Sequence, residues 1–304
     1  MPRSLPARVP VWDTVTVPHR LTLGLRALAH EDPWLELDED LECDLREKHV
    51  LLRDRHSQVF VELPESMSSQ RETFSLIADT LLTRHPELYS KQGSRLRVHA
   101  TDELVELDDP ARSPLESASR CVQEDLVVMQ ERPRGWCLTA ASVCFPTRWD
   151  LPIQLGRPMG TIHEPVPGYQ EQLDVSSNRF FDGTKPGIVY RRGNWSLLDD
   201  PTLFQPTRKL QRDAGVALNA SNAGQQVWLR VEHQTLQRLP ETGAILFTIR
   251  IHRTRLDAVA REPGAARSLV GAIETMHPAM QRYKSLGIVR NATLGYLGRT
   301  IEAM

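Results

Sequence analysis

Several features that mark common protein classes are missing from this chain of 304 residues. No apolar run approaches the ~20 residues of a membrane-spanning helix, and the N-terminal sequence lacks the apolar stretch of a secretory signal. The cysteines show no CxxC or CxH spacing, which argues against a cysteine zinc site or an iron–sulfur cluster and fits a reduced, cytoplasmic protein. The four cysteines are Cys43, Cys121, Cys137 and Cys144.

A charge bias and nucleotide-binding motifs are missing as well. Lysine and arginine number 37 against 39 acidic residues, a formal net charge of −2, so nucleic acid is not expected as the main ligand. Neither GxGxxG nor GxxxxGK[ST] occurs, so a strand–loop–helix nucleotide site has no support. Hydrophobic residues make up 40% and charged residues 25%, as in an ordinary globular protein of one large or two smaller domains.

Hydrophobic periodicity predicts an α+β fold in which helices flank an antiparallel sheet. A proline-rich arm that carries Trp12 and Trp34 comes first, and no internal repeat is present. Alternating runs between turn residues predict strands, and apolar stripes at helical spacing predict helices. The expected strands occupy 50–54, 59–63, 95–100, 103–107, 125–131, 136–145, 187–198, 226–239 and 244–254. The expected helices occupy 69–85, 113–124, 168–181, 265–281 and 291–303.

The hairpin over 226–254 combines apolar and charged faces. Alternate residues of a strand share a face, so Arg230, Glu232 and Gln234 lie together and opposite to Leu229. We expect the apolar faces of both strands to be buried in the core. Two interpretations of the polar group stay open. It is a solvated outer face with ion pairs, which periodicity favours, or it lines a pocket under the terminal helices.

One histidine, His163, directly precedes a segment that Pro165 and Pro167 stiffen. Imidazole is the commonest metal-ligating side chain, although an isolated histidine is more often structural. No second histidine stands nearby at HxH or HxxxH spacing, so a zinc or non-haem iron site would need ligands from distant segments. A haem needs only one protein ligand on one side of its iron. Cys144, in an apolar strand, fits packing better than ligation.

Two adjacent arginines, Arg191 and Arg192, precede Asn194 and Trp195 in a predicted strand. Guanidinium groups pair with carboxylates and phosphates, so the two arginines are candidates for anion binding. An exposed pair of charges on an edge strand is the commoner alternative.

An ordered set of short segments resembles the α subunit of haem-dependent oxidative N-demethylases, the dimethylamine-monooxygenase-like family. The specificity comes from the order and spacing of the segments, which extend over most of the chain. The segments are VQEDL at 122–126, VCFPTRW at 143–149, LGR at 155–157, IHEPVP at 162–167, RGNW at 192–195, LRVEHQTLQRLP at 229–240 and TGAILFTIR at 242–250.

This resemblance implies a PAS-like core that binds haem b, formed by an antiparallel sheet flanked by helices. It divides the chain into an N-terminal arm with a mixed helix and strand extension over 1–110, the core over 111–260, and C-terminal helices over 261–304 that pack on the core. His163 is then the axial ligand of the iron. The haem propionates need cationic partners, and the candidates are Arg230, Arg192 and Arg238.

The resemblance also implies oxidative N-demethylation of a small secondary amine such as dimethylamine, with O₂ as co-substrate and formaldehyde as a product. Electrons come from NADPH through separate FMN and iron–sulfur proteins, and the chain has no motif for either, so a reductase partner is implied. Glu232 is the expected partner of the substrate ammonium, with Trp195 or Tyr169 as wall residues. A haem-binding sensor without turnover and a haem-free binding protein remain as alternatives.

Overall fold

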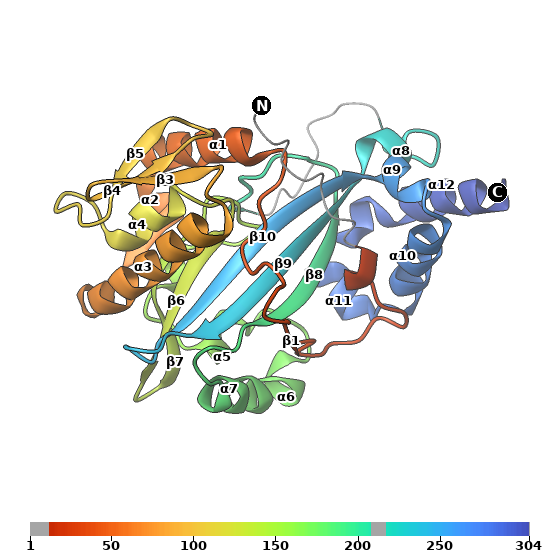
Figure 1. Ribbon diagram of the computed structural model, residues 1–304. Helices are drawn as coiled ribbons and strands as arrows, with labels where there is room; N and C mark the ends of the chain where they lie inside the picture. The colour runs from red at the N-terminus through yellow and green to blue at the C-terminus, as the bar shows by residue number, and fades with distance from the viewer. Residues whose placement is uncertain (1–11, 208–216, 304) are drawn as a thin grey trace.

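The computed structural model describes residues 12–207 and 217–303, and in that part the predicted α+β class is confirmed. A seven-stranded antiparallel sheet in the order β1–β8–β9–β10–β6–β7–β2 forms its centre (Figure 1). The strands are β1 (Arg26–Ala27), β2 (Phe60–Glu62), β6 (Asp125–Arg132), β7 (Gly135–Ser142), β8 (Tyr190–Leu198), β9 (Trp228–Arg238) and β10 (Ile245–Arg255).

The N-terminal region adds helices and a three-stranded sheet beside the β6–β7 end of the large sheet (Figure 1). Phe74, Ile77 and Leu81 form the buried stripe of the longest of these helices, as their spacing predicts. The elements are α1 (Leu41–Asp54), α2 (His56–Val59), α3 (Met67–Arg84), β3 (Tyr89–Gln92), β4 (Arg95–Val98), β5 (Glu103–Glu106) and α4 (Pro114–Ser119).

The strand predicted at 50–54 was wrong, because this run is the last part of α1. Leu51 and Leu52 extend the buried stripe that Leu41 and Leu45 begin, and this spacing belongs to a helix. The apolar run was short enough to fit either structure, and the preceding turns of the helix decide between them.

The later helices form two groups, one below the sheet in Figure 1 and one beyond its β8–β9 end. The helix predicted over 168–181 divides at Leu173, and the one predicted over 265–281 is interrupted before Pro278, which cannot donate a backbone hydrogen bond. The helices are α5 (Met159–Ile162), α6 (Tyr169–Gln172) and α7 (Asp174–Gly183), then α8 (Ala223–Gln226), α9 (Leu256–Ala260), α10 (Pro263–Thr275), α11 (Pro278–Tyr283) and α12 (Arg290–Glu302).

The register of the β9–β10 hairpin changes the expected distribution of its apolar faces. Glu232 pairs with Ile251, and Val231 pairs with His252. Cross-strand partners point to the same side of a sheet, so the apolar face of one strand lies beside the polar face of the other. Both apolar faces are largely buried, as expected, but on opposite sides of the sheet, so each face of the hairpin is mixed.

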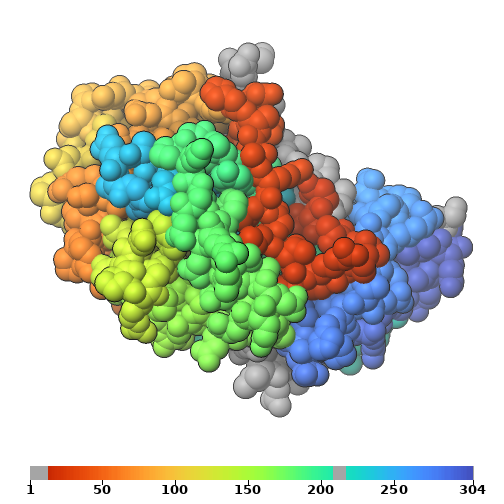
Figure 2. Space-filling view, turned by 90° about the horizontal axis from the view of Figure 1, so that it is seen from below, coloured from red at the N-terminus to blue at the C-terminus, as the bar shows by residue number. Residues whose placement is uncertain are grey.

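The N-terminal segment is joined to the large sheet at both edges. β1 pairs with β8 at one edge, and β2 pairs with β7 at the other. Between β1 and β2 the chain crosses the front of the sheet in Figure 1. In Figure 2 the red residues near the N-terminus lie between the green residues and the blue C-terminal helices. The division at 110 and 260 remains a prediction. No helix within 12–207 or 217–303 has the length and apolar character needed to cross a membrane.

Candidate functional site

His163 ends the short helix α5 and starts a turn that leads into α6. Its backbone amide donates to the Met159 carbonyl at 3.1 Å, and its own carbonyl accepts from the Val166 amide at 2.9 Å. Gly168 has a φ of +80°, a conformation open to glycine at little cost. The turn brings the Tyr169 ring onto the imidazole, with ring centroids 4.6 Å apart and planes within 12°. The rigid segment therefore ends with two stacked rings.

The hydrogen bond of the His163 ring fixes its tautomer. Nδ1 lies 2.9 Å from the Met159 carbonyl oxygen, which can only accept, so Nδ1 carries the proton and Nε2 keeps its lone pair. Within the described part of the chain, no side chain or backbone group donates to Nε2. Burial lowers the pKa of His163 and so favours the neutral ring. A neutral imidazole oriented through Nδ1 is the form in which histidine ligates a metal.

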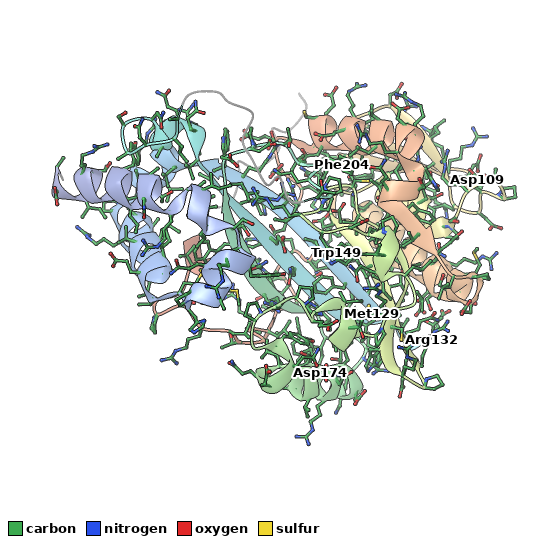
Figure 3. The ribbon with its side chains drawn as sticks, turned by 180° about the vertical axis from the view of Figure 1, so that it is seen from behind. Asp109, Met129, Arg132, Trp149, Asp174 and Phe204 are labelled. Atoms are coloured by element: carbon green, nitrogen blue, oxygen red, sulfur yellow. The ribbon has the colours of Figure 1, made fainter. Side chains whose placement is uncertain are left out.

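Helix α5 packs against one face of the large sheet, which we call the Glu232 face. It carries Arg192, Asn194, Glu232 and Gln234, since Arg192 pairs with Gln234 and Asn194 with Glu232. All four side chains are partly exposed although they lie on central strands. Figure 3 shows this side, with Trp149 over the strands and Asp174 on the helix below.

Four of the predicted site residues come together here. Arg192 interacts electrostatically with His163, with Tyr169 and with Glu232. Burial lowers the pKa of the Arg192 guanidinium, and its Nε atom is buried without a hydrogen-bond partner in the described ranges. A buried guanidinium nitrogen without an acceptor favours an anionic partner at this point.

Neutral groups hold the Glu232 carboxylate. Oε1 accepts from the Thr147 hydroxyl at 2.6 Å, and Oε2 accepts from the Gln234 amide at 2.8 Å and the Asn194 amide at 3.3 Å. These donors orient the carboxylate, and the cationic side chains of Arg192, Arg230 and Lys284 also interact with it electrostatically.

Sequence reasoning missed Lys284, which follows α11 and reaches the site from the C-terminal helices. Its ammonium donates to the Asn194 side-chain oxygen at 2.8 Å and the Trp195 carbonyl at 2.6 Å. Burial lowers the pKa of Lys284 to about 8, and Glu232 partly offsets this effect. No motif surrounds Lys284, so only its position in space marks it.

The other two predicted arginines use their guanidinium groups for hydrogen bonds within the protein. The Arg230 side chain is buried and donates to Thr147 and to the carbonyls of Phe145, Thr202 and Leu203. Its guanidinium joins the segment after β7 to the segment after β8. Arg238 donates to carbonyls at the far end of β9, including that of Gly243, and its guanidinium lies 5.2 Å from the centroid of the Trp136 ring.

Trp195 and Cys144 do not contribute side chains to the Glu232 face. Trp195 pairs with Val231, so its side chain is buried on the opposite face, with Lys284 Nζ 5.6 Å from its ring centroid. Cys144 is fully buried, and burial raises the pKa of its thiol to about 12. A neutral thiol packed in the core agrees with the structural interpretation of this cysteine.

A comparison with protein families shows to which family this chain belongs. Residues 24–294 match the model of the haem-dependent oxidative N-demethylase, alpha subunit-like family. The chain belongs to this family. Its name indicates haem-dependent oxidoreductase chemistry, and "alpha subunit-like" indicates a system of more than one component. The matched range includes the sheet, His163 and the whole Glu232 face.

Proposed function

We propose that this protein binds haem b through His163 and oxidatively demethylates a small secondary amine, with dimethylamine as the first candidate. The observation that carries the proposal is the hydrogen bond from His163 Nδ1 to the Met159 carbonyl, which leaves Nε2 as a free ligand atom. The residues present fit the cofactor in a second way, because Arg192 has a buried nitrogen without an acceptor and a propionate would supply one.

Arg192 is a better candidate for a propionate partner than Arg230 or Arg238. Arg230 already donates to five groups within the protein, and Arg238 donates to the backbone carbonyls of Phe181 and Thr184. The partial exposure of Arg192 and its neighbours on a central strand supports a bound group on this face.

When bound, haem supplies the activation of O₂ by iron, and two electrons and two protons complete the reaction. One oxygen atom enters the N-methyl group, which leaves as formaldehyde, and the other becomes water. The chain carries no flavin or iron–sulfur motif, so we propose that a reductase partner with FMN and an iron–sulfur cluster delivers the electrons from NADPH.

In this proposal the protein's own residues position the substrate. The Glu232 carboxylate, which three neutral donors orient, accepts a hydrogen bond from the substrate ammonium. Lys284 interacts electrostatically with Glu232 and holds Asn194, which in turn orients the carboxylate. Tyr169 keeps the imidazole in place by stacking on it and is a positioning residue in this scheme. Trp195 supports Lys284 from the opposite face.

The experiment is a visible spectrum of the purified protein after haem reconstitution, followed by the spectrum of His163→Ala. We expect a Soret band that is lost or shifted in the variant and unchanged in the exposed-histidine control His30→Ala. No Soret band in the native protein would exclude haem binding, and an identical band in His163→Ala would exclude this ligand.

A second assay separates an enzyme from a sensor. The reduced haem protein is exposed to O₂ with dimethylamine, and formaldehyde is measured. We expect formaldehyde from the native protein and a loss of ~10²-fold or more in Glu232→Gln with the Soret band retained. Haem binding without formaldehyde from any small N-methylamine would support a haem-binding sensor instead.

A further inference from the structure

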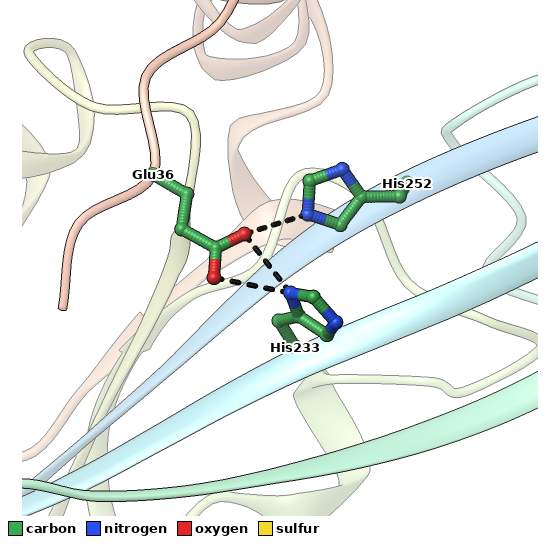
Figure 4. A group of neighbouring side chains, drawn as sticks. All are labelled: Glu36, His233 and His252. Atoms are coloured by element: carbon green, nitrogen blue, oxygen red, sulfur yellow. Dashed lines mark hydrogen bonds and ion pairs between the residues drawn. The ribbon is translucent and has the colours of Figure 1, made fainter. Parts of the chain in front are cut away.

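A second group of potential ligands lies on the opposite face of the sheet, which we call the Glu36 face. It carries Arg191, His233, Arg250 and His252, and the segment before α1 brings Glu36 onto it (Figure 4). We propose that Glu36, His233 and His252 form a binding site for a divalent first-row metal ion, with Zn²⁺ as the preferred ion. This site is separate from the haem site and does not rest on the proposed function.

The sheet places the two histidines side by side. His252 pairs with Val231, two residues from His233 on the same face of β9. Their ring centroids are 4.9 Å apart. Both imidazoles are almost fully buried, with 3% and 5% of their surface exposed. Glu36 then approaches from a segment almost 200 positions earlier in the chain, so three donors from three segments converge.

The donor atoms have nearly the separation that one metal ion requires. His252 Nε2 lies 2.8 Å from Glu36 Oε2, and His233 Nδ1 lies 3.0 Å from both carboxylate oxygens. All three ligand atoms lie within 4.8 Å of one another. Zinc–nitrogen and zinc–oxygen bonds are ~2.0–2.2 Å, which puts neighbouring ligand atoms roughly 3.3 Å apart around a tetrahedral ion. Small side-chain shifts would therefore admit an ion.

The proton of His233 cannot satisfy all the contacts of its ring. Nδ1 faces the Glu36 carboxylate and also the Nη2 donor of Arg191, 3.2 Å away. A protonated Nδ1 repels the guanidinium, and an unprotonated Nδ1 repels the carboxylate. A cation between Nδ1 and the carboxylate removes the need for a proton on Nδ1, because the Nδ1 lone pair and a carboxylate lone pair then both point at the cation. Arg191 Nη1 keeps its contact with Glu36 Oε1 at 3.2 Å.

The charges around the site also favour a cation. Four carboxyl groups lie in this network, and among the described residues two arginines pair with them. Arg250 pairs with two of the carboxylates, at 2.8 and 3.2 Å, and Arg191 pairs with Glu36. The fourth carboxyl group accepts from the Glu36 backbone amide at 2.6 Å, and burial raises its pKa to about 7, so it carries less than a full negative charge. The carboxyl groups are those of Glu36, Asp38, Asp44 and Glu124.

The donor set determines the class of metal. Two imidazoles and one carboxylate suit zinc and the neighbouring first-row ions, whereas calcium and magnesium prefer oxygen donors alone. A metal here would connect the segment before α1 to the centre of the sheet and so stabilise the fold. His233 Nε2 and His252 Nδ1 are buried without a partner within the described ranges, and the remaining ring proton would reside on these atoms.

The test uses the full-length protein, stripped with a chelator and titrated with Zn²⁺ alone by calorimetry. We expect one Zn²⁺ per chain, with affinity reduced on the order of 100-fold or more in His233→Ala and in His252→Ala. His30→Ala is the matched control, because this histidine is exposed, and it should bind as the native protein does. Glu36→Gln provides a variant of nearly equal size if an alanine variant does not fold.

Binding of Co²⁺ provides a second, spectroscopic test of the same site. Co²⁺ in a site of low coordination number gives visible ligand-field bands, which we expect in the native protein and in His163→Ala but not in His252→Ala. Equal affinity of the native protein and His252→Ala for zinc would overturn the proposal. Absence of binding to the stripped native protein at micromolar Zn²⁺ would also overturn it. Because His163→Ala removes the haem ligand alone, failure of this proposal is distinguishable from failure of the proposed function.

Discussion

The two faces of the central sheet use polar side chains in different ways. On the Glu232 face, Arg192 and Glu232 stay partly exposed, and neutral groups hold the carboxylate. On the Glu36 face, Arg250 and His252 are buried and bound to carboxylates. Both sets come from alternate positions of the same strands. The difference shows that the covering segments, rather than the strands, decide whether a charge is available to a ligand or used within the protein.

The largest expected effect is a loss of stability when a buried charge on the Glu36 face is removed. Arg250→Met leaves Asp38 and Asp44 buried without their guanidinium partner, and breaking a buried ion pair costs ~3–5 kcal/mol. Urea unfolding would measure this loss in the free energy of unfolding. Arg46→Met is the matched control, since its pair with Glu42 is exposed and contributes ~0.5 kcal/mol or less. Similar losses in both variants would contradict the assignment.

The next effect is a loss of haem affinity, which tests whether the Arg192 charge on the Glu232 face is available to a ligand. Arg192→Met should weaken haem binding about tenfold or more, because a hydrogen bond to a charged group is worth ~1.5–3 kcal/mol. Haem titration followed by absorbance would measure the affinity. Arg238→Met, which loses bonds to backbone carbonyls instead, should keep an affinity near that of the native protein. A larger loss in Arg238→Met would transfer the propionate role to Arg238.

The smallest effect concerns Lys284 at the margin of the Glu232 face. Its pKa is lowered to about 8 in the folded protein from an ordinary value of 10.5, so between these values the unfolded chain binds the extra proton. Native stability should therefore rise with pH relative to Lys284→Met, by ~1.4 kcal/mol per pH unit at most. Urea unfolding at pH 7, 8, 9 and 10 measures the difference. A difference that stays constant from pH 8 to 10 would contradict the lowered pKa.

Much of the secondary structure follows from local patterns. The hairpin of β6 and β7, the hairpin of β9 and β10, and the helices α3 and α12 occur close to their predicted ranges. β9 and β10 alternate, α3 has a clear apolar stripe, and the turn residues Arg132–Gly135 mark the hairpin of β6 and β7. The run at 50–54 is short, and the preceding turns of the helix decide its structure, whereas the helix predicted over 168–181 divides at Leu173.

The candidate sites divide in the same way. The segment around His163 could be identified from its prolines and from the resemblance of ordered motifs, and Arg192 and Glu232 from the charges on predicted strands. Lys284 and Glu36 could not, because neither has a sequence signal and both act through contacts with distant strands. His252 likewise acquires its partners only through the fold.

The sequence by itself determined the antiparallel α+β class, the alternation of each strand and the rigid turn after His163, because each depends on residues close together in the chain. Only the tertiary structure decided which side chains of neighbouring strands share a face of the sheet and which charges are paired. The register that sets His252 beside Val231, and the path that carries Glu36 across the sheet, join segments far apart in sequence. Such contacts depend on the packing of the whole chain, and no local pattern specifies them.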